Sequence, residues 1–274
     1  MRRIAPLDLA HLARSAIAHA PPRFETLAPQ DLWIDERYQR DLSARSVRLI
    51  GKMVARWDWA RFRPPVGCFI EGAVHLIDGQ HTAIAAATHG GIAAIPVAIV
   101  EAATLAQRAR AFVGLNRDRI QATGAQIYFA ELAAGDDEAA TVAQVCARAG
   151  VTLLKYPPPM ARFKPGDTLA ISTLRRLIDK HGAMRARVVL ETLVKARCAP
   201  LAADLIRAAA ELLYAPEYDG LFTQESLSVE IRALGDAFPA AARRLAEERG
   251  MTLWRALASH LAHRGGRHVA RPAA

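Results

Sequence analysis

The sequence is short of aromatic residues and long apolar runs, and each shortage narrows the class of protein. Phe, Trp and Tyr make up only 6% of the 274 residues. Alanine is abundant instead, which favours closely packed helices. No apolar run reaches the roughly 18 residues that a membrane-spanning helix needs. The opening Met1-Arg2-Arg3 is followed by polar residues such as Asp8 and Arg14, which interrupt the apolar core of a signal peptide. We therefore expect a cytoplasmic protein with no membrane partner.

Cysteine is also scarce. Cys68, Cys146 and Cys198 are widely spaced among apolar neighbours, and they form no Cys-x-x-Cys pair. This pattern predicts buried free thiols in a reducing compartment, and it predicts neither a disulfide framework nor a metal site.

The chain has 36 basic and 27 acidic residues, a formal net charge of +9. This excess indicates a polyanionic partner, for which DNA is the natural choice. The alternative is that the charge only keeps an alanine-rich helical protein in solution.

The most informative stretch runs from residue 74 to residue 86. Its spacing predicts a strand, a tight turn at Asp78-Gly79 and then a helix. Gln80, His81 and Thr82 would then lie on a polar loop at a helix N-terminus, where unpaired N–H groups and the helix dipole favour an anion. The alternative is an ordinary turn in which Asp78 caps the helix.

The first half of the chain mixes short strands with helices. Glu71-Gly72 predicts a two-residue hairpin turn, and Ser43 predicts a helix N-cap. The helix after Ser43 has Val47, Ile50 and Val54 spaced for one buried face. The expected elements are helices over residues 7–18, 43–56 and 104–115, an extended segment over 27–34, and strands over 66–70, 73–77 and 95–100.

A second polar cluster, residues 116–121, lies between two predicted helices. It contains Asn116, Arg117 and Arg119, and Thr123 follows with the spacing of a capping box. The alternative interpretation of this cluster is a solvated helix connection.

In this order, these segments resemble the N-terminal domain of the ParB/sulfiredoxin superfamily over about residues 27–131. The segment Tyr38-Gln39-Arg40 matches a polar loop of that domain. The segment Asp78-Gly79-Gln80-His81-Thr82 resembles the Asp-Gly-Gln-His-Arg turn of one branch, and residues 116–119 resemble the Asn-x-x-Arg segment of ParB proteins. Thr82 replaces the expected arginine, which weakens the charge at the turn. The catalytic cysteine of sulfiredoxin is absent from the turn.

The resemblance implies an α+β fold, with a ParB/sulfiredoxin-like N-terminal domain followed by an all-α helical domain. It also implies a nucleotide ligand, namely a nucleoside triphosphate with Mg²⁺. The expected nucleotide- or phosphate-binding residues are Arg40, Gly79, Gln80, His81, Thr82, Asn116, Arg117 and Arg119. An alternative hypothesis is an enzyme with the same pocket, namely an NTPase, phosphotransferase or nuclease. Its catalytic groups would be Asp78, His81 or Glu36. A third reading is a non-catalytic interaction protein with a degenerate pocket.

The second half of the chain reads as helical. Residues 141–149 resemble the first helix of a helix-turn-helix motif, but prolines 157–159 break the recognition helix that should follow. The expected DNA-binding residues are Lys155, Arg162, Lys164, Arg175 and Arg176. The predicted domains are an N-terminal extension (1–24), a nucleotide-binding domain (25–135), a helical domain (136–263) and a flexible basic tail (264–274). The chain would be a bacterial or phage protein that is associated with DNA in the cytoplasm, and it could form a homodimer.

Overall fold

The computed structural model describes residues 3–39, 41–118, 121–235 and 238–269. The chain divides into two compact units, Met1–Ile120 and Gln121–Ala274. The described residues form ten α-helices, a mixed five-stranded sheet and a two-stranded sheet, so the fold is α+β as predicted. No helix in the described ranges is long and apolar enough to cross a bilayer.

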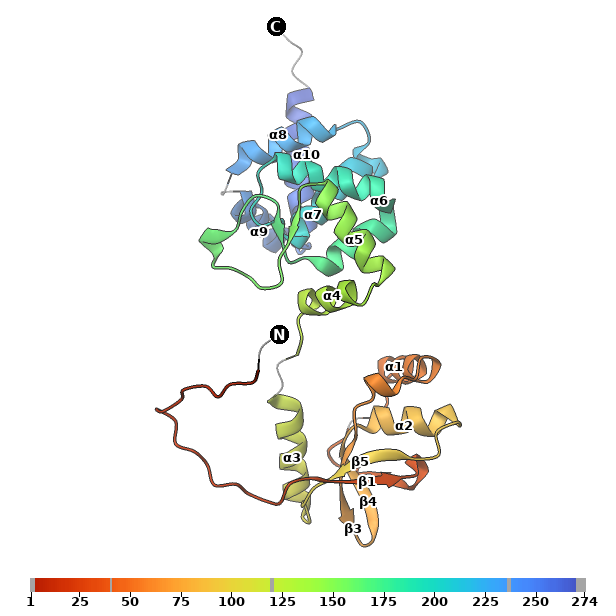
Figure 1. The fold of residues 1–274 in the computed structure, drawn as a ribbon. Helices are drawn as coiled ribbons and strands as arrows, with labels where there is room; N and C mark the ends of the chain where they lie inside the picture. Colours follow the sequence, from red (N-terminus) through yellow and green to blue (C-terminus); the bar gives the residue numbers. More distant parts are fainter. Residues whose placement is uncertain (1–2, 40, 119–120, 236–237, 270–274) are drawn as a thin grey trace. The chain divides into compact units, whose positions relative to one another are not determined.

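The N-terminal unit is organised around the five-stranded sheet (Figure 1). Its strands lie in the order β1-β5-β3-β4-β2. The β1–β5 and β3–β4 pairs are antiparallel, whereas the β3–β5 and β2–β4 pairs are parallel. The strands are β1 (Arg23–Leu27), β2 (Leu32–Ile34), β3 (Val66–Ile70), β4 (Ala73–Asp78) and β5 (Ile95–Ile99).

The β3–β4 hairpin forms where the sequence predicts it. Its two turn residues, Glu71 and Gly72, have φ angles of 50° and 85°. Positive φ at both positions gives the turn a twist that matches the twist of the strands. The prediction of the hairpin is confirmed.

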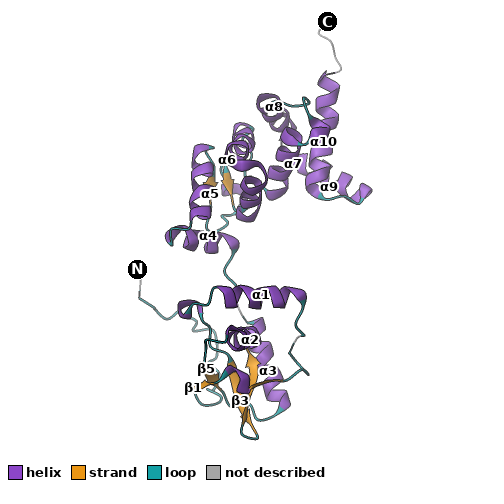
Figure 2. Ribbon diagram, turned by 90° about the vertical axis from the view of Figure 1, so that its right-hand side faces the viewer, coloured by secondary structure: helices purple, strands orange, loops and turns teal. Residues whose placement is uncertain are grey.

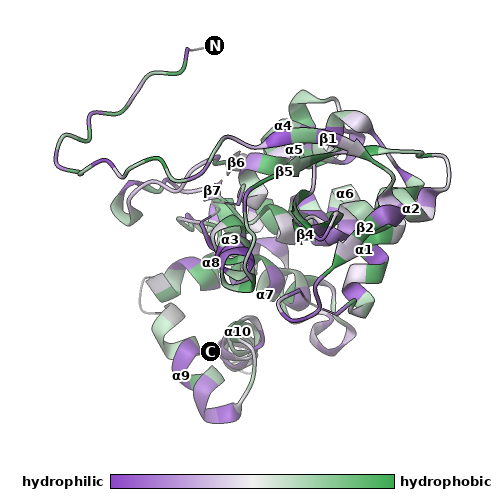
Figure 3. Ribbon diagram, turned by 90° about the horizontal axis from the view of Figure 1, so that it is seen from below, coloured by the Kyte–Doolittle hydropathy of each residue, from purple (hydrophilic) through white to green (hydrophobic). Residues whose placement is uncertain are grey.

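Helices cover both faces of this sheet. Val74 and Leu76 pack against α2 (Gln80–His89) on one face, whereas Ile77 packs against α3 (Leu105–Arg117) on the other. Figure 1 shows α2 and α3 on opposite sides of the strands, and Figure 2 shows α1 (Ala44–Ala55) beside α2. Figure 3 shows the apolar character of β5, which lies inside the sheet. Leu76 and Ile77 are fully buried, and burial of each stabilises the unit by about 1.5–3 kcal/mol.

Two predictions for this unit are wrong. Residues 7–18 form no helix, and every side chain in that segment is exposed, so no partner surface stabilises the weak amphipathic pattern. Ser43 does cap α1, because its side chain accepts a hydrogen bond from the Ser46 N–H. Val47, however, is 57% exposed, and only Ile50 of the predicted face is buried.

The C-terminal unit is a helical array with one continuous apolar core. Thr123 forms the predicted capping box at the start of α4. Gly182, with φ 77° and ψ 160°, interrupts α6. The helices are α4 (Gly124–Ala133), α5 (Asp137–Arg148), α6 (Ile171–Lys195), α7 (Ala203–Tyr214), α8 (Gln224–Leu234), α9 (Phe238–Arg249) and α10 (Leu253–Val269).

No recognition helix follows α5 directly. In its place two short parallel strands, β6 (Thr152–Leu153) and β7 (Asp167–Thr168), flank the proline-containing loop. Residues 264–269 of the predicted flexible tail are helical instead, because α10 continues to Val269, and residues 270–274 lie outside the described residues. The division into units falls after Ile120, ahead of α4, whereas the sequence analysis placed the boundary after residue 135.

Candidate phosphate-binding site

The junction between β4 and α2 is tighter than the predicted loop. Asp78 ends β4, Gly79 is the N-cap with φ 92°, and Gln80 already begins α2. A Cβ atom on residue 79 would lie 2.7 Å from Pro65 Cα, so only glycine fits between strand and helix. The prediction of a polar loop over residues 78–82 is therefore wrong: Gln80, His81 and Thr82 occupy the first turn of the helix. The N–H groups of that turn have no partner within the helix, and this end of the dipole favours an anion.

Side chains of this first turn differ in their surroundings. Gln80 is only 8% exposed. The Nε2 atom of His81 is buried and has no hydrogen-bond partner among the described residues. Thr82 is half-buried and lines a cavity of ≈ 500 Å³. Of these three first-turn residues, Thr82 is the one that lines this cavity.

This cavity, which we call the Thr82 cavity, is formed mainly by α1 and the segment that follows it. Its lining includes four basic side chains and one carboxylate. The carboxylate, Asp58, pairs with Arg61 at 3.3 Å between Oδ2 and Nε. The other three basic side chains make no ion pair within the described residues. The lining residues are Lys52, Met53, Arg56, Trp57, Asp58, Arg61, Phe62, Arg63 and Thr82.

Aromatic side chains form one wall of the Thr82 cavity. The ring centroid of Trp57 lies 5.8 Å from that of Phe62 and 5.5 Å from that of Trp59. The Trp57 indole N–H is buried and has no acceptor among the described residues. Indole and phenyl faces are surfaces on which a nucleobase can stack, and an unpaired indole donor can meet a base carbonyl. Cations and an aromatic wall, with Thr82 from the first turn of α2, together suit a phosphate joined to a planar base.

The second predicted phosphate segment lies elsewhere in the unit. Asn116 and Arg117 form the last turn of α3 and are exposed, and Asn116 Nδ2 donates to the Phe112 carbonyl oxygen at 2.9 Å. Helix α3 covers the sheet face opposite α2, and it contributes no residue to the lining of the Thr82 cavity. Arg40 and Arg119 lie outside the described residues. The expectation that residues 116–119 bind the same phosphate stays a prediction.

The three residues expected to be catalytic also stay predictions. Glu36 is exposed, and its neighbour Asp35 is the buried carboxylate of that loop. Arg37 holds Asp35 with two hydrogen bonds of 2.8 Å, and these are the main reason that the pKa of Asp35 lies below its usual value. Asp78 is the last residue of β4, and His81 is the second residue of α2. Within the described ranges, no group of three or more His, Cys, Asp and Glu side chains is arranged to hold a metal ion.

The expected DNA-binding residues fall into two groups. Lys155, Arg162 and Lys164 are exposed on the loop between β6 and β7. Arg175 instead pairs with Glu131, and its Nε atom lies 3.4 Å from Oε1 of Glu138. These two ion pairs tie α6 to α4 and α5. Arg176 is exposed on the same helix. The structure thus gives Arg175 a structural role that the sequence analysis did not foresee.

The sequence analysis also missed the basic and aromatic wall of the Thr82 cavity. Its signal is the run from Arg56 to Arg63, in which arginines alternate with Trp57, Trp59 and Phe62. Interleaved basic and aromatic residues are typical of sites that bind nucleotides or single-stranded nucleic acids.

Comparisons with known proteins add little to this geometry. No family model matches the sequence, and no curated protein matches it either. Among solved structures, the chain is similar to the C-terminally truncated chromosome-partitioning protein ParB from Caulobacter crescentus, complexed with CTP-gamma-S. The similarity has a TM-score of 0.35 and 12% sequence identity, and it covers 87% of this chain and 98% of that chain. These values are too low to establish a common fold, so a functional conclusion must rest on this chain alone.

Proposed function

We propose that this protein binds a nucleoside triphosphate, or another ligand with a phosphate group, in the Thr82 cavity and acts in association with DNA. The observation that carries the proposal is the meeting of three cations that make no ion pair within the described residues, the Trp57 indole and Thr82 of the first turn of α2 in one cavity. The volume of ≈ 500 Å³ falls within the range usual for small-molecule sites.

Each part of the cavity has a role in this proposal. The phosphates would accept hydrogen bonds from the first-turn N–H groups of α2 and the hydroxyl of Thr82. Lys52, Arg56 and Arg63 would neutralise the phosphate charge, which compensates for the absence of arginine at position 82. The base would lie against Trp57 and Phe62. Mg²⁺ would be held mainly by the phosphate oxygens, since that is how this ion usually binds with nucleotides.

Calorimetric titration of the full chain with ATP, GTP, CTP and UTP, with and without Mg²⁺, tests the proposal. We expect Arg56→Gln and Arg63→Gln each to weaken binding by about 1 kcal/mol, roughly fivefold, because both side chains are exposed. The matched control is Arg45→Gln, which removes an exposed arginine of α1 that does not line the cavity. Absence of binding to all four nucleotides, or an equal loss in the control, would sink the proposal. Nucleotide turnover measured on the same samples separates a binding protein from an enzyme that uses Asp78, His81 or Glu36.

The DNA-associated part of the proposal rests on separate residues. Lys155, Arg162 and Lys164 are exposed on a loop stiffened by three consecutive prolines, and the whole chain has a net charge of +9. Without a recognition helix after α5, base edges in the major groove are hard to reach. Contacts to phosphates would then supply most of the affinity.

A further inference from the structure

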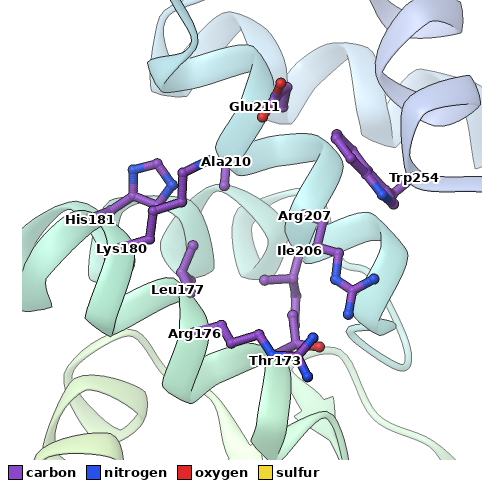
Figure 4. A pocket seen from close by; sticks show the side chains of 10 residues that line it. All are labelled: Thr173, Arg176, Leu177, Lys180, His181, Ile206, Arg207, Ala210, Glu211 and Trp254. Atoms are coloured by element: carbon purple, nitrogen blue, oxygen red, sulfur yellow. The ribbon is translucent and has the colours of Figure 1, made fainter. Parts of the chain in front are cut away.

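The C-terminal unit contains a second cavity, separate from the Thr82 cavity and formed by side chains of α6, α7 and α10. Its volume is ≈ 270 Å³, just below the usual range for small-molecule sites. Figure 4 shows its lining, which consists of Thr173, Arg176, Leu177, Lys180, His181, Ile206, Arg207, Ala210, Glu211 and Trp254. One lining residue, Arg176, was expected to bind DNA from the sequence, but the proposed nucleotide site does not use this cavity.

The floor of the cavity is apolar and one wall is aromatic. Leu177, Ile206 and Ala210 are each at most 5% exposed. Trp254 projects from α10 toward α7 and presents a half-buried indole. A flat apolar ring would bury its area against this floor and interact with the indole by stacking or by an edge.

One end of the cavity is cationic. In the view of Figure 4 the guanidinium groups of Arg176 and Arg207 lie at the end marked by Thr173, and Glu211 lies at the opposite end. Arg176 forms no ion pair within the described residues, and Arg207 has only a distant carboxylate, Asp204, at 4.0 Å from Nη1 to Oδ1. Two guanidinium groups at one end provide forked donors that match a carboxylate.

The charge balance around the cavity also favours an anion. Its lining holds three cationic side chains, including Lys180, and one carboxylate, Glu211. Burial is the main cause that lowers the pKa of His181, and the neighbouring Lys180 and Arg185 lower it further, while Glu211 opposes the shift. His181 is therefore mostly neutral at pH 7 and its ring adds to the apolar surface.

We propose that this cavity binds a small aromatic carboxylic acid, with the acid group between Arg176 and Arg207 and the ring against Trp254. The cavity is too small for a nucleoside triphosphate, so this site differs from the Thr82 cavity in ligand class as well as position. The proposal does not depend on nucleotide binding, and it fails or holds independently.

Calorimetry of the full chain with 2-naphthoate and its neutral counterpart 2-naphthamide tests the proposal. Both probes have the same fused ring, so they differ mainly in charge. We expect naphthoate to bind at least tenfold more tightly than naphthamide. Arg176→Gln and Arg207→Gln should each weaken naphthoate binding by about two- to fivefold, as expected for partly exposed ion pairs, and leave naphthamide binding unchanged. Arg148→Gln, which removes an exposed arginine of α5 outside the cavity, should change neither.

Tryptophan fluorescence tests whether the ligand lies beside the indole of Trp254. Naphthoate should change the tryptophan emission of the wild type, and most of that change should be absent in Trp254→Phe, which keeps a ring and should still bind by calorimetry. No heat of binding with naphthoate, equal affinity for the amide, or an equal loss in Arg148→Gln would overturn the proposal. Circular dichroism of each variant confirms that the fold is intact.

Discussion

The carboxylate of Asp35 and the guanidinium of Arg108 lie 3.9 Å apart inside the N-terminal unit, and each side chain is only 6% exposed. Arg37 holds the same carboxylate from the solvent side with two hydrogen bonds of 2.8 Å. Arg108 also donates from Nη1 to the carbonyl oxygen of Ala103 at 2.7 Å. The buried pair therefore ties the loop after β2 to the segment that enters α3.

Removal of the Asp35 charge should destabilise the unit. Asp35→Asn leaves Arg108 buried without its counter-charge, and we expect a loss of about 3 kcal/mol in the free energy of unfolding. Urea denaturation followed by circular dichroism measures this change. Glu36→Gln is the matched control. Because Glu36 is exposed, this change should alter the free energy of unfolding by no more than about 0.5 kcal/mol.

The same carboxylate predicts a dependence of stability on pH. The hydrogen bonds from Arg37 are the main cause that lowers the pKa of Asp35 in the folded chain. Its ionisation therefore stabilises the fold above the unfolded pKa of about 3.9, and this stabilisation is lost as the pH falls through the lower folded pKa. We expect stability to fall below about pH 4 in the wild type and to fall less steeply in Asp35→Asn. Equal slopes in the two proteins would contradict this assignment.

Two glycines of the N-terminal unit should respond to alanine in opposite directions. Gly79 has φ 92°, and its added Cβ would meet the backbone of Pro65 at 2.7 Å, so Gly79→Ala should cost more than about 2 kcal/mol. Gly51 lies in the middle of α1 with nothing within 4 Å of an added Cβ. Gly51→Ala should therefore stabilise the unit by about 0.5–1 kcal/mol. Thermal melts should show a lower melting temperature than the wild type for Gly79→Ala and a higher one for Gly51→Ala.

Two sets of basic residues should differ in their effect on DNA binding. The triple change of Lys155, Arg162 and Lys164 to Gln should reduce the affinity by a similar factor for DNA duplexes of unrelated sequence. It should also make the logarithm of the binding constant depend less steeply on the logarithm of the salt concentration. Arg175→Gln should instead lower the stability of the helical unit, because it breaks the pairs with Glu131 and Glu138. Fluorescence anisotropy at several salt concentrations measures the first effect. Tight binding to one duplex that persists at high salt would refute phosphate contacts as the main source of affinity.

The thiols of the helical unit should be inert in the folded protein. Burial raises the pKa of Cys146 to about 12 and that of Cys198 to about 11. Because the thiolate is the reactive form, both should react slowly with a disulfide reagent at pH 8 and fast after denaturation. Fast native reaction at Cys146 would show that the helix core opens on the time scale of the assay.

The sequence predicted those elements that depend on local chemistry. Glu71-Gly72 specified the hairpin turn and Thr123 the capping box, because each signal acts within a few residues. The prediction of a helix over residues 7–18 was wrong because that helix depends on more than local chemistry. A short helix depends on a surface to cover its apolar face, and no local pattern reveals whether that surface exists.

The candidate site shows the same division between local and tertiary information. The start of α2 was predicted as an anion site, since Gly79 and the helix N-terminus lie within one short segment. Lys52, Arg56 and Arg63 join Thr82 only after α1 packs beside α2, and no spacing in the sequence announces that contact. A tertiary arrangement therefore decides which cations surround the site.

The position of β1 at the edge of the sheet has a consequence for synthesis on the ribosome. Its ladder joins Leu27 to Ile95 and Arg23 to Ile99, so the first strand to emerge pairs with the last strand of the sheet. Closing so long a loop is slow compared with forming the local β3–β4 hairpin. A nascent chain that ends before Ile95 leaves β1 without a neighbour and one edge of β3 open. Such edges pair readily with other chains, so this interval of translation is when the N-terminal unit is most exposed to aggregation.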